Sequence, residues 1–490
     1  MTILRWTTAA AIVALVYCLW SGALIVGSAF DAGRWHRLWI DFGSLLWRFI
    51  LAAFAFRALL RMRRLNAYVA ATDRGAAAYR AKKYDRAVEA YDQALGAWPN
   101  DYDALYWRGW SLAHSGLFDR ALGDFDAIVR MKPRRAFAWL GRGFVFTGMG
   151  EYDKAIADYD RAIKLKPRDT HGYDHRAYAW TQSGELDRAI ADYDRVIALD
   201  RNNARAYRCR GYARAEKREF ERAITDYDRA IALDPTIPQL FYNRGVAWTE
   251  LGEHGRAITD FDTAEGICAD DEGAAAIAYE RGCARIELEQ YDLAVRDFDR
   301  VLEFEPDSFK ALYGRAWVRE KQGDVELALT DVNAAIIKEP NHRNSRLLRI
   351  SLLGDRGEHA AALADCDALV ALGSDDPAVY LRRAWERALA GGDASASLED
   401  CVRARELGED DHAVCRTRGF VQFHAGRFVE ALENYDRALV IDPACAHCRY
   451  CVGVCKLRLG RVEEGRADIA AVVAADPTVA ETQAKYGVIP

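Results

Sequence analysis

Four cysteines near the C-terminus have a spacing that could hold a metal. Cys445, Cys448, Cys451 and Cys455 follow the pattern C-x2-C-x2-C-x3-C, and thiolates spaced in this way can bind zinc or an iron–sulfur cluster. The last three also fall on one predicted helix, whereas a cluster needs a loop wrapped around it. We therefore interpret these thiols as buried packing residues. A metal site, with His447 as a further ligand, or a redox sensor is the alternative.

Paired carboxylates are the second feature that could do chemistry. Strings of aspartate, an aromatic residue and aspartate recur along the chain, as at 158–160 and 192–194, and two such acids could act as a general acid and a general base. A catalytic pair is needed once, however, whereas a structural element is needed in every repeated unit. The chain also lacks the phosphate-loop, zinc-protease and serine-hydrolase motifs. We therefore expect no enzyme and no cofactor.

The carboxylates belong to a repeated unit. A small residue returns at intervals of 34 residues, at Gly75, Gly109, Gly143, Ala177, Gly211 and Gly245. In each of these units an alanine follows further along, then an aromatic residue, as at Ala155 and Tyr159, and many units end in a proline such as Pro167. Apolar spacing predicts two helices per unit, 137–145 and 152–165 in the third, with a left-handed glycine between them. That turn glycine recurs at Gly116, Gly150, Gly184, Gly252, Gly323, Gly357, Gly392, Gly426 and Gly460.

This pattern resembles the tetratricopeptide repeat (TPR) family, which has the same unit length, small residues, aromatic and proline. The resemblance implies an all-α fold, a right-handed α-solenoid of about twelve helix-turn-helix repeats. We place the repeats at 67–479 and a C-terminal capping helix at 480–490, after one or two transmembrane helices within 1–66.

One position departs from the usual unit, because arginine replaces an apolar residue before the small one. It recurs at Arg74, Arg108, Arg142, Arg176, Arg210, Arg244, Arg281, Arg315, Arg349 and Arg418. The second helix of most units offers an aspartate, such as Asp158 or Asp192. We predict a ladder of Arg–Asp pairs that ties helices within or between units. Alternatively, the arginine side chains simply reach out to water.

The resemblance also implies a concave groove lined by the first helix of each unit. The positions that match are Tyr106, Trp110, Phe137, Phe144, Tyr178, Arg205, Arg208, Tyr212, Tyr242, Tyr279, Tyr313, Trp317, Arg382, Arg416 and Phe420. Aromatic rings interleaved with arginines suit an extended peptide that carries acidic groups or a C-terminal carboxylate. Some of these rings could instead pack between helices.

The N-terminal 66 residues read as a membrane anchor. Residues 7–30 carry no charge, which is long enough for one transmembrane helix; a cleaved signal peptide is the alternative. A second apolar stretch, 38–60, is interrupted by Asp41, Arg48 and Arg57, so it is either a second transmembrane helix or a helix lying in the interface.

A cluster of basic residues predicts the orientation of this anchor. Arg57, Arg61, Arg63 and Arg64 follow the second apolar stretch, and such clusters stay on the cytoplasmic side. We expect a protein of the bacterial inner membrane whose repeats are cytoplasmic. The whole chain has a net charge of −6 despite this basic head, which disfavours nucleic acid as a partner.

Together these features predict a membrane-anchored scaffold that binds partner proteins or extended segments in its groove, without catalysis. The alternative is a regulator that responds to a metal or an oxidant through the four-cysteine segment.

Overall fold

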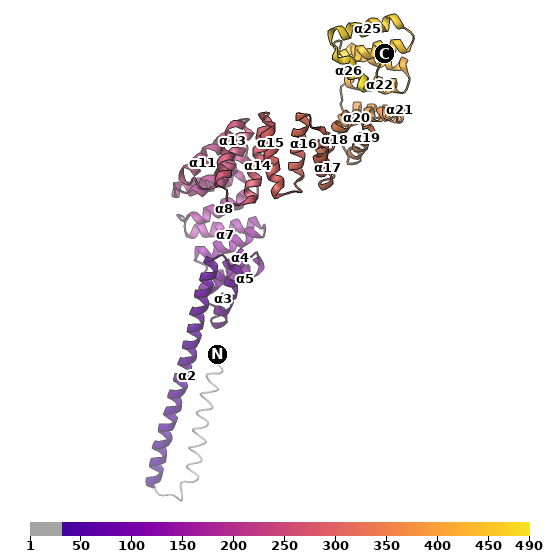
Figure 1. Ribbon diagram of the computed structural model, residues 1–490. Coiled ribbons are helices and arrows are strands. Elements are labelled where there is room, and N and C mark those ends of the chain that lie inside the picture. The colour runs from indigo at the N-terminus through magenta and orange to yellow at the C-terminus, as the bar shows by residue number, and fades with distance from the viewer. Residues whose placement is uncertain (1–31) are drawn as a thin grey trace. The chain divides into compact units, whose positions relative to one another are not determined.

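The computed structural model describes residues 32–490, which are helical throughout apart from short turns. The chain divides into two compact units, residues 1–201 and 202–490. The helices of the first unit are α2 (Ala32–Arg80), α3 (Tyr84–Ala97), α4 (Tyr102–His114), α5 (Phe118–Met131), α6 (Ala136–Gly148), α7 (Tyr152–Leu165), α8 (Thr170–Gln182) and α9 (Leu186–Leu199). Within this unit each helix packs against the next in the chain (Figure 1).

The second unit continues the same pattern. Its first helices are α10 (Ala204–Glu216), α11 (Phe220–Leu233), α12 (Pro238–Glu250), α13 (His254–Ile267), α14 (Asp271–Glu287), α15 (Tyr291–Phe304), α16 (Phe309–Gln322), α17 (Val325–Lys338), α18 (Arg343–Asp355) and α19 (His359–Ala371). They are followed by α20 (Pro377–Leu389), α21 (Ala394–Glu406), α22 (Asp411–His424), α23 (Phe428–Ile441), α24 (Ala446–Arg458), α25 (Val462–Ala475) and α26 (Thr478–Lys485). The helices from α2 to α25 form twelve pairs, and α26 follows the last pair, as the repeat pattern predicts.

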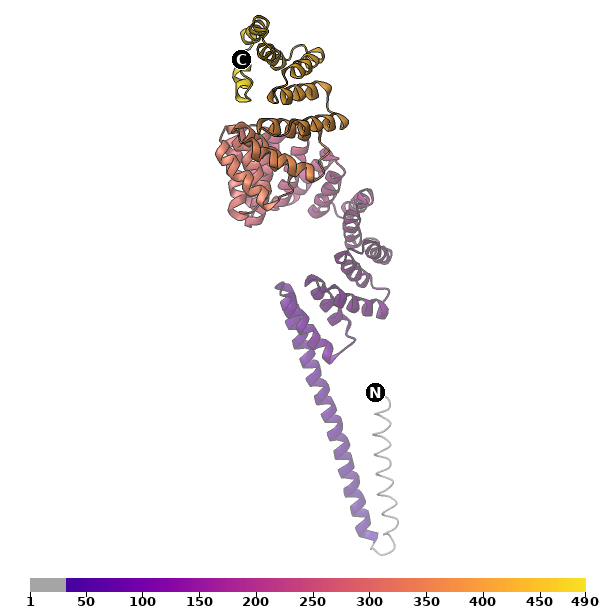
Figure 2. The ribbon, with the colours of Figure 1, turned by 90° about the vertical axis from the view of Figure 1, so that its right-hand side faces the viewer.

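The first helix differs from the predicted organisation. The helix α2 is 49 residues long and runs through 66 and 67 without a break, so the first helix of the first repeat is its C-terminal part. Its N-terminal half projects away from the other described helices of its unit (Figure 2). No helix among residues 32–490 is both long and apolar enough to cross a membrane. The prediction of a second transmembrane helix at 38–60 is therefore not supported, because Asp41, Arg48 and Arg57 interrupt its apolar character. The predicted span at 7–30 lies outside the described residues.

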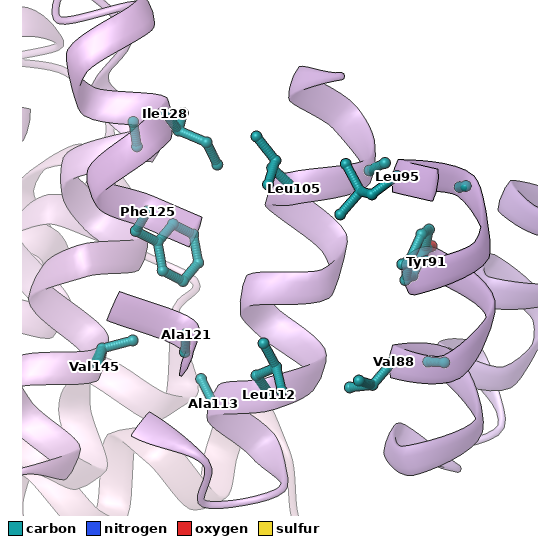
Figure 3. Close-up of a cluster of buried hydrophobic side chains, with 14 of the residues drawn as sticks. Val88, Tyr91, Leu95, Leu105, Leu112, Ala113, Ala121, Phe125, Ile128 and Val145 are labelled. Carbon is teal, nitrogen blue, oxygen red and sulfur yellow. The ribbon is translucent and has the colours of Figure 1, made fainter. Parts of the chain in front are cut away.

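The recurring small residues let the helices of a pair approach closely. A Cβ atom on Gly143 would lie 2.6 Å from the ring of Tyr159, the aromatic residue of the same repeat. Figure 3 shows this packing in the first unit, where the buried rings of Tyr91 and Phe125 fill the space between helices alongside Leu112 and Ile128. This close approach, with the aromatic ring filling the space beside the glycine, buries the facing sides of the two helices.

The turns between paired helices are left-handed, as predicted. Gly150 has a φ of +76°, a conformation that glycine adopts without steric cost. In the tenth repeat Gly391 takes this conformation instead of the predicted Gly392. Lys82, Arg218 and Glu289 adopt positive φ where the turn has no glycine.

Candidate functional site

The arginine ladder is present and ties two helices of one repeat together. In the third repeat, Nε of Arg142 donates to Oδ2 of Asp158 at 2.7 Å and Nη2 donates to Oδ1 at 2.8 Å. These hydrogen bonds raise the pKa of Arg142 above its ordinary value, so the guanidinium stays charged. The same paired geometry joins Arg108–Asp124, Arg176–Asp192, Arg210–Asp226, Arg244–Asp260, Arg315–Asp331, Arg349–Asp365 and Arg383–Asp400.

Most of these guanidinium groups also reach back to the preceding repeat. Nη1 of Arg142 donates to Oδ1 of Asp126 at 2.8 Å, and Asp126 lies on α5, one repeat earlier. Equivalent bonds join Arg108–Asp92, Arg176–Asp160, Arg244–Asp228, Arg315–Asp299 and Arg383–Asp367. The first aspartate of each string therefore pairs within its repeat, and the second pairs with the next repeat. The prediction of a ladder is confirmed, and the carboxylates are structural.

The ladder changes at its two ends. In the first repeat Nη2 of Arg74 donates to Gln93 at 2.7 Å. In the eleventh repeat Asn434 occupies the position that holds aspartate elsewhere. Nε of Arg418 and Oδ1 of Asn434 are both buried without a hydrogen-bond partner in the described structure.

Four predicted groove residues of the first unit, on α4 and α6, form a continuous aromatic surface. The ring centroids of Tyr106 and Phe137 lie 5.2 Å apart, and those of Trp110 and Phe144 lie 4.9 Å apart, between helices α4 and α6. Tyr106 and Trp110 also pack edge-on against the buried Phe125. These rings are half-buried and serve helix packing as well as lining the surface.

In the second unit a hollow of about 400 Å³ contains two of the predicted tyrosines, Tyr212 and Tyr242. Glu216, Glu250 and Glu280 line it with one cation, Arg218. Burial raises the pKa of Glu280. This excess of carboxylates does not suit an acidic peptide, so the predicted ligand chemistry does not apply to this part of the surface.

A second hollow, which we call the C-terminal cavity, has a volume of about 430 Å³. Arg382, Arg416 and Phe420, three of the predicted groove residues, line it from α20 and α22. Phe420 is buried and stacks on Trp385, with ring centroids 3.5 Å apart and nearly parallel planes. Tyr486 lies edge-on to Trp385 at 5.4 Å.

The two arginines of the C-terminal cavity differ in their partners. Nε of Arg382 lies 2.7 Å from Oε1 of Glu386, so its charge is largely neutralised. Arg416 is exposed and has no ion pair among the described residues. An unpaired guanidinium in a cavity that aromatic rings also line is suited to bind a carboxylate.

The remaining predicted groove residues lie on the first helices of their repeats, as expected. Arg205 and Arg208 are on α10, Tyr279 is on α14, and Tyr313 and Trp317 are on α16. Tyr178, on α8, is 45% exposed. None of these residues lines the C-terminal cavity.

The four cysteines do not meet at one point. Cys451 and Cys455 are buried in the core of the last repeats, and Sγ of Cys451 contacts Oε1 of Gln483 at 3.4 Å. Cys445 and Cys448 instead lie beside His412, at the start of α24. A metal centre with all four cysteines as ligands is therefore not formed, because the helix directs the last two sulfur atoms into the core.

Cys445 and Cys448 are chemically unequal. Sγ of Cys448 lies 2.8 Å from Sγ of Cys445, and the backbone N–H of Cys448 donates to the same sulfur at 3.3 Å. The contact with the Cys448 sulfur, together with the neighbouring His412, lowers the pKa of Cys445. Sequence reasoning missed His412, although it lies about one repeat length before Cys445. That interval was a usable signal, because equivalent positions of successive repeats are neighbours.

Family models of the tetratricopeptide repeat match residues 72–136, 279–341, 320–377 and 417–480, and another matches 136–169. A TPR repeat model matches 177–217 and 213–252. Together these matches cover more than half of the chain.

Individual relatives are more distant. The Protein CTR9 homolog of Arabidopsis thaliana is 36% identical over 70 residues, which is 14% of this chain and 6% of that protein. A tetratricopeptide repeat protein from Parabacteroides merdae is 21% identical, with a TM-score of 0.39 over 52% of this chain and 98% of that one.

Cut9 and Hcn1 form a solved APC/C hetero-tetramer, which is similar at 19% identity and a TM-score of 0.43. The match covers 57% of this chain and 54% of that chain, so the chain spans about half the length of this solved relative. The repeats identify the chain as a member of the tetratricopeptide repeat family, whose helix pairs serve as scaffolds for protein–protein interaction.

Proposed function

We propose that this protein is a scaffold that binds an extended protein segment through the C-terminal cavity, without catalysis. The observation that carries the proposal is the unpaired, exposed Arg416 beside the buried, stacked Phe420. A guanidinium recognises a carboxylate through two parallel hydrogen bonds, and the aromatic rings that line the cavity provide apolar contact for a neighbouring side chain. The preferred ligand is therefore a segment with an acidic side chain or a free C-terminal carboxylate.

A peptide-binding experiment on the full chain tests this proposal. An immobilised peptide library would present each sequence with a free C-terminal carboxylate and as the amide, together with acidic and neutral internal segments. We expect selective binding of the carboxylate-bearing peptides, weakened about tenfold or more by Arg416→Ala. The matched control is Arg403→Ala, because Arg403 is an exposed arginine that pairs with Glu406 on α21, outside the cavity. Equal binding of amides and carboxylates, or equal effects of the two variants, contradicts the proposal.

We further propose that the N-terminal part of the chain holds the scaffold at a membrane, with the repeats on the cytoplasmic side of a bacterial inner membrane. The uncharged residues 7–30 support this. So do the large apolar side chains of α2, which are exposed on a projecting helix: Trp47, Leu51, Phe54 and Phe56 are each more than 60% exposed. Four arginines, Arg57, Arg61, Arg63 and Arg64, follow these side chains and would face anionic head groups.

Flotation of the full chain with liposomes tests this anchoring. We expect the protein to float with vesicles that contain anionic lipid and to resist extraction by high salt. Phe54→Asp should reduce the bound fraction, whereas Asp153→Ala, an exposed change on α7, should leave it unchanged. Recovery of the wild-type chain in the soluble fraction contradicts the proposal. Labelling of the native cysteines in intact and in opened cells reports on which side of the membrane the repeats lie.

A further inference from the structure

Three metal-binding side chains from two successive repeats meet at the N-terminal ends of α22 and α24. They are His412, Cys445 and Cys448, and their ligand atoms all lie within 4.8 Å of one another. Nε2 of His412 is 3.9 Å from Sγ of Cys448. Within residues 32–490 this is the one group of three or more such side chains close enough to share an ion.

We propose that His412, Cys445 and Cys448 bind one zinc ion. One imidazole and two thiolates form a donor set that zinc prefers over the hard cations magnesium and calcium. Tetrahedral zinc would place the two sulfur atoms roughly 3.8 Å apart and each sulfur roughly 3.5 Å from the nitrogen. The separation of 3.9 Å between Sγ of Cys448 and Nε2 of His412 is close to the second value, whereas the two sulfur atoms, at 2.8 Å, would have to move about 1 Å apart. Cys445 precedes the first residue of α24 and is only half-buried, so a rotation about its Cα–Cβ bond can open the site.

Three protein ligands leave one coordination position of a tetrahedral zinc ion to be filled. Asp442 is not among the side chains close enough to share the ion, although its Oδ2 lies 4.0 Å from Nε2 of His412, so a water molecule would occupy the fourth position. On binding, each thiol releases its proton to solvent and the imidazole stays neutral. Cys448 is fully buried and Cys445 and His412 are partly exposed, which leaves a path for the ion on one side.

The ion would connect the last two repeats directly. His412 belongs to the first helix of the eleventh repeat, and the two cysteines belong to the start of the twelfth. The ladder is interrupted here, because Val452 of the twelfth repeat occupies the position that holds the ladder arginine in most other repeats. Zinc would therefore strengthen the contact between repeats where the usual pairing is lacking. Cys448 also lines the C-terminal cavity, so the ion would help to hold that wall in place.

Metal titration of the full chain, purified with a chelator and a reductant, tests the proposal without any partner or membrane. We expect one equivalent of zinc to bind, and cobalt to give the thiolate charge-transfer and tetrahedral absorption bands. Cys448→Ser, Cys445→Ser and His412→Ala should each weaken binding about 100-fold. Cys268→Ser, a half-buried cysteine on another repeat, is the matched control and should bind as the wild type does.

Thermal unfolding of each variant in chelator separates loss of the site from loss of the fold. We expect the metal-free variants to unfold near the metal-free wild type, and zinc to stabilise only the wild type and Cys268→Ser. The proposal is overturned if no cobalt–thiolate band develops, or if His412→Ala binds as tightly as the wild type. It is also overturned if thiol counting shows that Cys445 and Cys448 form a disulfide in the purified protein and the reduced form still binds no metal.

Discussion

Removing one aspartate of the ladder should loosen the repeat that contains it. In Asp158→Ala the Arg142 guanidinium loses two hydrogen bonds, at 2.7 and 2.8 Å, and keeps only the bond to Asp126. The Asp158 side chain is 6% exposed and that of Arg142 is 21% exposed, so water replaces the lost partner only in part.

The structure sets the size of this effect. Leaving a fully buried charge without its partner costs about 3–5 kcal/mol. Arg142 retains Asp126 and some solvent, so we expect about 2–3 kcal/mol for Asp158→Ala. Asp126→Ala should cost less, because Asp126 is 36% exposed. Asp153→Ala, on the exposed face of the same helix, should change stability by less than about 0.5 kcal/mol.

Hydrogen exchange measured by mass spectrometry is the suitable assay, because stacked repeats open locally and the method reports on each repeat separately. Peptides from α6 and α7 should exchange about 30- to 150-fold faster in Asp158→Ala, which is 2–3 kcal/mol at 1.4 kcal/mol per decade. Peptides from α3 should be unaffected. If Asp158→Ala exchanges no faster than Asp153→Ala, the ladder does not stabilise the repeats. Replacing Arg142 and Asp158 together with leucine should restore much of the protection, because no charge is then left unpaired.

Three further predictions concern packing, pairing and pH. Gly143→Ala should destabilise its repeat by more than about 1 kcal/mol, because the new methyl group would lie 2.6 Å from the Tyr159 ring. Gly123→Ala, with open space around its Cβ position, should instead stabilise α5. Thermal unfolding compares the two variants, and equal effects on stability would contradict this reasoning. Asn434→Asp should slow exchange in α22 and α23 by giving Arg418 the missing carboxylate, and unchanged protection would mean that the two groups do not meet. Burial lowers the pKa of His424, so the folded state keeps this imidazole neutral. The contribution of His424 to the free energy of unfolding should be fully present above its unfolded pKa of about 6.5 and fall as the pH drops below that value. Melting temperatures measured over a pH series should therefore depend less on pH in His424→Leu than in the wild type.

The helices and their pairing could be predicted from local pattern. The small residue at Gly143 and the aromatic residue at Tyr159 have equivalents at the same positions of most repeats. They recur because the two helices of each repeat must bury the same faces against each other. The Arg–Asp ladder could be predicted from the same 34-residue spacing, since residues at equivalent positions of successive repeats have equivalent neighbours. The residues at which helices begin and end were less predictable. The helix α2 passes through residue 66 without a break, because nothing in that stretch stops a helix.

The sequence by itself determined the repeat, its turns and which arginines and aspartates form the ladder, because these residues recur at fixed positions of the unit. Only the tertiary structure decided which residues of different repeats meet. Stacking gives Arg142 its second partner, Asp126, and brings His412 beside Cys445 and Cys448 while it directs Cys451 into the core. The physical reason is that helical periodicity encodes which face is buried, whereas the contact between repeats depends on how the buried faces fit together.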